Sequence, residues 1–131
     1  AEGSTVTVFD ADSGGLIYSR EHSATLERIS RLLTDSGGKR LLAYTRENCG
    51  VSVWGFQTGV PLAAYTIPYP GGMRDVAFRP DGAEIITDPE IALDERVYVR
   101  ASDRSLEERT VMYPLSGSNA LDTDASGQWL L

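Results

Sequence analysis

The segment Val51-Ser-Val-Trp-Gly55 has two counterparts elsewhere in the chain at almost constant spacing. They are Val6-Thr-Val-Phe-Asp10, which lies 45 residues earlier, and Val97-Tyr-Val-Arg-Ala101, which lies 46 residues later. Alternating β-branched residues are typical of strands, and a cluster of turn-forming residues follows each copy, at 12–15, 57–59 and 102–105. Each copy therefore predicts the first strand of a hairpin.

Two further sets of residues repeat at offsets of 44 or 45 residues. In the first, Leu62, Thr66 and Tyr69-Pro70 match Leu106, Thr110 and Tyr113-Pro114. In the second, glycine-containing turns lie between apolar runs and predict strand pairs at 28–33 and 40–44, 74–78 and 84–87, and 119–122 and 129–131. Residues 22–33 also carry apolar side chains at helical spacing, so a partly helical segment there is the alternative.

Four short strands per period is the pattern of a β-propeller blade, whose antiparallel strands a, b, c and d run from the inside outward. The predicted fold class is all-β, with strands in the order c-d, a-b-c-d, a-b-c-d, a-b. We expect one domain, 1–131, with blade parts at 1–22, 23–67, 68–113 and 114–131. These parts make about three blades, whereas closed propellers have about four to eight. The ring is therefore expected to be incomplete.

Two arrangements can complete such a ring. The chain ends within an apolar strand, Trp129-Leu-Leu131, whose edge would be left unpaired. We therefore expect an excerpt from a longer polypeptide that holds the remaining blades. Alternatively, the a-b pair of one copy joins the c-d pair of a second copy in a shared blade.

Two stretches resemble the WD40 family of propeller repeats. Val76-Ala-Phe-Arg-Pro-Asp-Gly82 resembles its inner strand and Ser-Pro-Asp-Gly turn, and Val51-Ser-Val-Trp-Gly-Phe-Gln-Thr-Gly59 resembles its Trp-Asp strand and Thr-Gly turn. The neighbouring YVTN and TolB-like repeats are similar as well. Gly55 stands where the family has Asp, and Tyr-Pro replaces Gly-His before strand a, so the hydrogen-bonded tetrad of the family is incomplete here. The resemblance implies a non-enzymatic scaffold that binds other proteins through its b–c and d–a loops.

Composition narrows the classes of partner. Nineteen acidic residues against twelve basic ones give a net charge of −7, which repels nucleic acid and anionic membranes. No apolar stretch approaches the roughly 20 residues that span a bilayer, so no membrane insertion is expected. A single cysteine, Cys49, and a single histidine, His22, exclude an internal disulfide and the usual zinc sites. We expect no cofactor and no metal, and the compartment stays open, with the cytoplasm slightly favoured.

The candidate binding residues follow from topology. In a propeller the d–a and b–c loops emerge on one face beside the channel mouth, here at 19–25, 46–49, 68–73, 88–96 and 114–118. No catalytic set is expected. The candidates for binding on this face are His22, Arg46, Tyr69, Asp88, Glu90 and Tyr113.

Each candidate residue has a structural interpretation as well as a functional one. Polar neighbours make His22 a surface residue by default, with general base catalysis as the alternative. Tyr69 and Tyr113, each before a proline, form structural turns or act as aromatic anchors. The carboxylates around Asp88 and Glu90 do not have the spacing of a calcium loop and predict a solvated acidic loop. If these groups converged at the channel mouth, the chain would instead be part of an enzyme or a small-ligand-binding propeller.

Two residues are expected to be structural. Trp54 is predicted to lie in the core with Val51 and Val53, where a large aromatic side chain packs one sheet against another. Cys49 is interpreted as an inert small residue at the junction of a loop and a strand.

Overall fold

The computed structural model describes residues 4–22, 28–66, 72–89, 96–101, 108–112, 122–123 and 129–130. Within these ranges every regular element is a β-strand, which confirms the all-β prediction. The strands are β1 (Thr5–Phe9), β2 (Leu16–Glu21), β3 (Arg31–Thr34), β4 (Arg40–Tyr44), β5 (Gly50–Gly55), β6 (Pro61–Thr66), β7 (Met73–Phe78), β8 (Glu84–Pro89), β9 (Arg96–Ala101), β10 (Glu108–Met112), β11 (Asp122–Thr123) and β12 (Trp129–Leu130).

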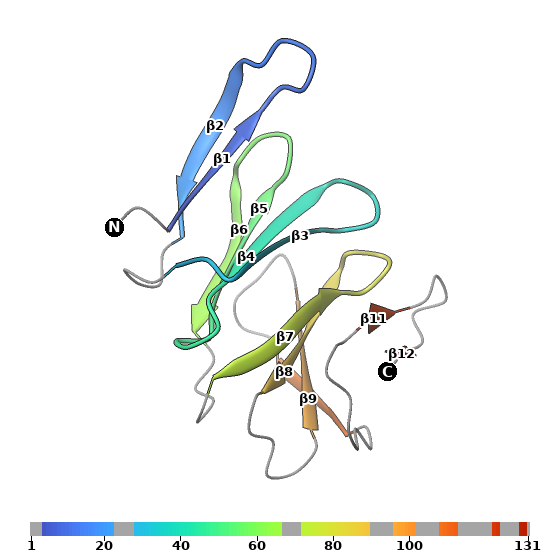
Figure 1. Ribbon diagram of the computed structural model, residues 1–131. Helices are drawn as coiled ribbons and strands as arrows, with labels where there is room; N and C mark the ends of the chain where they lie inside the picture. The colour runs from blue at the N-terminus through green and yellow to red at the C-terminus, as the bar shows by residue number, and fades with distance from the viewer. Residues whose placement is uncertain are drawn as a thin grey trace.

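The strands form antiparallel sheets in chain order. The β1–β2 hairpin is followed by a sheet of order β3-β4-β5-β6, a sheet of order β10-β9-β8-β7 and the β11–β12 pair. Figure 1 shows the hairpin and the sheets that contain β5 and β7 one after another along the molecule. The predicted order of c-d, a-b-c-d, a-b-c-d and a-b is therefore confirmed.

Some predicted strand boundaries and loops are wrong by a few residues. The strand predicted from Arg28 begins at Arg31, and the described residues 28–33 contain no helix. The loop predicted to begin at Asp88 begins later, because β8 continues its pairing with β7. Asp88 lies opposite Asp75, and Pro89 lies opposite Met73 beyond a bulge in β7. Met73 is likewise the first residue of a strand rather than part of a loop.

The two central strands of the sheet of β3 to β6, β4 and β5, are buried on both faces. Val51 and Val53 of β5 belong to a core with Leu42, Met73, Val76 and Ile85, which joins this sheet to β7 and β8. Trp54 belongs to a second core with Val6, Leu41 and Ala43, which joins the sheet to the hairpin. The prediction that Trp54 is buried is confirmed, since it is 4% exposed. It packs on the opposite face from the two valines, because neighbouring residues of a strand point to opposite sides.

The β1–β2 hairpin packs against the turn between β5 and β6, which ends at Gly59. The Tyr18 hydroxyl donates to the carbonyl oxygen of Phe56 at 2.7 Å, and Arg20 Nε donates to the carbonyl oxygen of Gly59 at 2.7 Å. Gly59 has a φ of 65°, and a Cβ atom placed on it would lie 2.7 Å from Cγ of Tyr18. Only glycine fits this position without a shift of the ring.

Three ion pairs among the described residues stabilise the next two sheets, two of them within a hairpin and one between the sheets. Asp35 pairs with Arg40 at 3.3 Å, and Arg79 pairs with Glu84 at 2.5 Å, so the same turn position carries opposite charge 44 residues later. Between the sheets, Arg31 of β3 pairs with Asp75 of β7 at 2.8 Å. The Arg31–Asp75 pair and the shared core hold β7 against β3 and so position the segments that precede these two strands.

Candidate functional site

The loop between β4 and β5 has a buried base and an exposed tip. At the base, the Thr45 amide donates to the carbonyl oxygen of Gly50 at 2.9 Å, and the Gly50 amide donates to the Thr45 hydroxyl at 3.1 Å. Cys49 closes the loop with a left-handed φ of 50°. The tip residues Arg46, Glu47 and Asn48 are exposed. The predicted loop at 46–49 is confirmed, and Arg46 lies on it as expected.

The backbone of Arg46 joins three separate segments of the chain. Its amide donates to the hydroxyl of Ser30 at 2.9 Å, and the Ser30 amide donates to the carbonyl oxygen of Tyr44 at 2.8 Å. Its carbonyl oxygen accepts from the Met73 amide at 2.9 Å. These bonds hold the segment before β3, the β4–β5 loop and the start of β7 in fixed relative positions.

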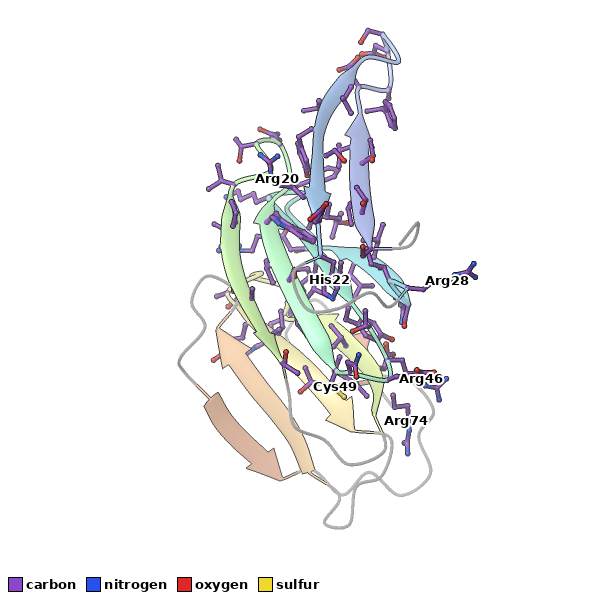
Figure 2. All side chains as sticks on the ribbon, turned by 90° about the vertical axis from the view of Figure 1, so that its left-hand side faces the viewer. Arg20, His22, Arg28, Arg46, Cys49 and Arg74 are labelled. Atoms are coloured by element: carbon purple, nitrogen blue, oxygen red, sulfur yellow. The ribbon has the colours of Figure 1, made fainter. Side chains whose placement is uncertain are left out.

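Each of the three segments carries an arginine, and we call Arg28, Arg46 and Arg74 the arginine edge. Figure 2 shows the three labelled side chains along one edge of the molecule, away from Arg20. Arg28 and Arg46 are exposed and Arg74 is half-buried. A depression of about 380 Å³ lies at this edge and is lined by Arg28, Ser30, Arg46 and Glu47. The lining residues that the structure describes are all exposed, so the depression is open to solvent.

Asp75, which follows Arg74 in the chain, has a buried side chain that is paired with Arg31. The side chain of Asp75 is 6% exposed and accepts hydrogen bonds from Arg31 and from the Val76 amide, each at 2.8 Å. Burial raises the pKa of the Tyr44 phenol, the negative charge of Asp75 raises it further, and Arg31 and Arg46 act in the opposite direction. Asp75 is therefore ion-paired and almost inaccessible to solvent.

Comparison with known proteins bears on the fold. No protein-family model and no curated protein matches the chain. The β-propeller domain of Cps50 (Swd1) from Myceliophteria thermophila is similar to it with a TM-score of 0.68 at 14% identity, over 94% of this chain and 42% of that chain. A KlHsv2 variant with loop 6CD replaced by a Gly-Ser linker has a TM-score of 0.62 at 14% identity, over 90% of this chain and 38% of that chain. Kluyveromyces lactis Hsv2p has a TM-score of 0.58 at 12% identity, over 76% and 31%.

The chain has the fold of a partial β-propeller. It spans less than half the length of each of these structures, which agrees with the incomplete ring. In propeller terms, Arg46 lies on the b–c loop of one blade and Arg28 lies before strand a of the same blade. Arg74 lies at the start of strand a in the next blade. The arginine edge therefore belongs to the face on which b–c and d–a loops emerge.

The prediction that His22 is a surface residue is wrong. It follows β2 directly, is only 3% exposed, and its amide donates to the carbonyl oxygen of Ser4 at 2.7 Å. Tyr18, Arg20 and His22 alternate onto the face of the hairpin that packs on the next blade, whatever the polarity of the residues between them. Among the described residues, neither ring nitrogen has a hydrogen-bond partner within normal geometry. Burial lowers the pKa of His22, and an interaction with the Gly50 backbone partly offsets this.

Among the other candidate binding residues, the structure describes Asp88 but not Tyr69, Glu90 or Tyr113, which lie outside the described residues. The backbone of Asp88 is part of β8 rather than of a loop, because of its pairing with β7. Sequence reasoning missed Arg28, Ser30 and Arg74. A signal for the two arginines was present, since both predicted inner strands, 28–33 and 74–78, begin with arginine.

Two other features are absent from the described residues. They contain no group of three or more His, Cys, Asp or Glu side chains placed to hold a metal ion. They also contain no helix of the length and apolarity that a membrane span requires.

Proposed function

We propose that this propeller is a non-enzymatic scaffold that binds protein partners through its b–c and d–a loops. The observation that carries the proposal is the joining of three segments from two blades by the backbone bonds of Arg46. Loops held in this way form one continuous surface that loses little conformational entropy on binding. Arginine is also enriched in protein interfaces and among the residues that contribute most to affinity.

A small-ligand site at the channel mouth is the second candidate. The volume of the depression, about 380 Å³, lies within the usual range for ligand pockets. Such pockets bury most of their ligand and are lined mainly by apolar side chains. The described lining residues here are exposed and carry polar or charged side chains, which suits the rim of a protein interface better.

We further propose that the remaining blades of a longer chain, or a second copy, complete the ring. The outer part of the β1–β2 hairpin supports this, since Phe9, Leu16 and Ile17 are 59%, 62% and 47% exposed. Another blade packed on this hairpin would remove these apolar side chains from water. Light scattering on the 131-residue chain should show dimers or aggregates, whereas a stable folded monomer contradicts this part of the proposal.

Site-specific photo-crosslinking tests the binding face. A photoreactive amino acid replaces Asn48 at the tip of the b–c loop in one variant, and Lys39 in the control. Both positions are exposed, and they lie at opposite ends of β4. We expect the Asn48 position to crosslink a recurring protein that the Lys39 position does not. Crosslinks to that protein only from Lys39 would place the interface on the other face and contradict the proposal.

A further inference from the structure

We propose that the outer edge of β1 is a docking site for strand β12 of a second copy of this chain, so that the two strands join in one shared blade. This inference rests on the proposed completion of the ring and names the strands and the register that join the copies. Among the described residues, β1 pairs only with β2, and β12 pairs only with β11. Figure 1 places β1 and β12 at opposite ends of the molecule, so they do not pair within one copy.

Strand β1 is the structural equivalent of β5, which lies 45 residues later. After β1, the Asp10 amide donates to the carbonyl oxygen of Gly15 at 2.8 Å, and after β5 the Gly55 amide donates to that of Val60, also at 2.8 Å. Both hairpins have a register shift at the same position of the repeat. Strand β5 pairs with β4 along its other edge, and the equivalent edge of β1 has no partner among the described residues.

Strand β12 is the structural equivalent of β4 and β8. Leu41, Ile85 and Leu130 occupy the same position in the three a–b pairs, where they lie opposite Thr34, Phe78 and Asp122 respectively. Strands β4 and β8 each pair further with a c strand, β5 and β9. Within the described part of the chain, β12 is therefore a b strand without a c strand, and β1 is a c strand without a b strand.

The complete blades define the register of the contact. Leu41 lies opposite Trp54 in the first of them, and β8 pairs with β9 in the equivalent register. The same register places Leu130 of one copy opposite Phe9 of the other. Phe9 is 59% exposed, whereas Trp54, its equivalent within a complete blade, is 4% exposed. Completion of the blade therefore covers an apolar side chain that otherwise stays in water.

The backbone of β1 presents hydrogen-bonding groups to this edge. The amide of Asp10 and the carbonyl oxygen of Ser4 both bond on the side of β2. In an antiparallel strand the N–H and C=O groups of successive residues point to alternate edges. The backbone groups of Thr5, Thr7 and Phe9 therefore point toward the outer edge, where a strand of another chain can pair with them.

Two copies close a ring of plausible size. Each copy contains two four-stranded sheets, so two copies give four such blades and two shared ones. Six blades lie within the range of about four to eight found in closed propellers. The two contacts are then related by a two-fold axis, and the assembly stops at the dimer because no outer edge is left.

One residue pair of the contact is suited to a disulfide. In the complete blade Arg40 and Gly55 form a non-hydrogen-bonded pair, because the amide of the next residue, Phe56, donates at 2.8 Å to the carbonyl oxygen of the residue before Arg40. The equivalent pair between copies is Trp129 and Asp10. The Cα atoms of such a pair are about 4.5 Å apart, which is within the range that a disulfide spans.

Cysteine crosslinking of the 131-residue chain tests the register. The variants Asp10→Cys and Trp129→Cys are made separately and mixed in a glutathione redox buffer, and linked peptides are identified by mass spectrometry. In the control mixture Thr7→Cys replaces Asp10→Cys, which moves the thiol about 10 Å along the strand. Thr7 and Asp10 are both exposed, and the native Cys49 is 1% exposed. We expect at least about tenfold more disulfide from Asp10→Cys than from Thr7→Cys.

A second variant measures the contact without a cysteine. Phe9→Asp places a charge where the shared blade buries an apolar ring, so it should weaken the dimer at least about tenfold in sedimentation velocity. The matched control is Val60→Asp, which changes another apolar side chain that is 54% exposed and should leave the dimer unchanged. Circular dichroism melting curves establish that each variant is folded.

The inference is overturned by equal disulfide yields at positions 7 and 10, by folded variants that give no disulfide, or by an equal effect of Phe9→Asp and Val60→Asp. If the chain is dimeric but its disulfides form off register, a second copy completes the ring in another way and only this inference is wrong. A stable folded monomer contradicts both. If the in-register disulfide forms and the Asn48 position gives no recurring crosslink, the shared blade stands and the scaffold proposal is wrong.

Discussion

Replacement of Gly59 by alanine should destabilise the chain more than the same replacement at Gly14 or Gly38, two other glycines with positive φ. Gly59 has a φ of 65°, where an L-residue loses about 1–2 kcal/mol. The added Cβ would also lie 2.7 Å from Cγ and 2.8 Å from Cδ2 of Tyr18, which is closer than van der Waals contact allows. Tyr18 is 7% exposed and its hydroxyl is bonded to Phe56, so its ring has little freedom to move away.

Two glycines serve as controls for the backbone term alone. Gly14 and Gly38 have φ values of 68° and 61°, and a Cβ atom on either would have no neighbour within 4 Å. Alanine at these positions should therefore cost only the conformational strain, about 1–2 kcal/mol. At Gly59 the overpacking against Tyr18 should add about 1–3 kcal/mol.

Urea unfolding, followed by tryptophan fluorescence at one protein concentration, gives the three free energies. In a Tyr18→Ala background, Gly59→Ala should lower the free energy of unfolding by less than it does in the wild type, because the clash with the ring has been removed. If Gly59→Ala costs no more than Gly38→Ala, the contact of the hairpin with the glycine turn does not constrain the fold, and our account of how the first blade docks is refuted.

Three other predictions concern the two cores and the buried histidine. Trp54→Ala should lower the free energy of unfolding by about 3–5 kcal/mol, since the side chain is 4% exposed, and an unchanged melting temperature would contradict its place in the second core. The pKa of His22 is lowered in the folded state, which therefore favours the neutral ring. The contribution of His22 to the free energy of unfolding should be constant above pH 6.5, the pKa of an ordinary histidine, and should fall as the pH drops below it. Melting curves from about pH 8 to about pH 5.5 should show this loss in the wild type and not in His22→Leu, and equal curves would refute the assignment. Cys49 is 1% exposed, so its thiol should react with Ellman's reagent only after denaturation, and rapid reaction of the native chain would show that the β4–β5 loop opens.

Local patterns in the chain are enough to predict the strands and their order. The 44–46-residue period and the alternation of β-branched residues place β1, β5 and β9 within one residue of their observed positions. Strand β4 is predicted at its observed bounds. Both signals arise from neighbouring residues, because strand alternation and glycine turns depend on the local backbone. They also lead to the propeller class, since four strands per period is a property of the repeat.

The faces of the strands and the candidate site depend on contacts between distant segments. The sequence predicts that Trp54 and Val51 are both core residues. Because a different blade packs on each face of their sheet, the two side chains contact different blades. His22 has polar neighbours and reads as exposed, yet the docking of the hairpin buries it. The arginine edge exists because bonds from Arg46 reach Ser30 and Met73, which lie 16 and 27 residues away. A sequence pattern records which residues alternate, whereas tertiary packing determines which surface each alternating face meets.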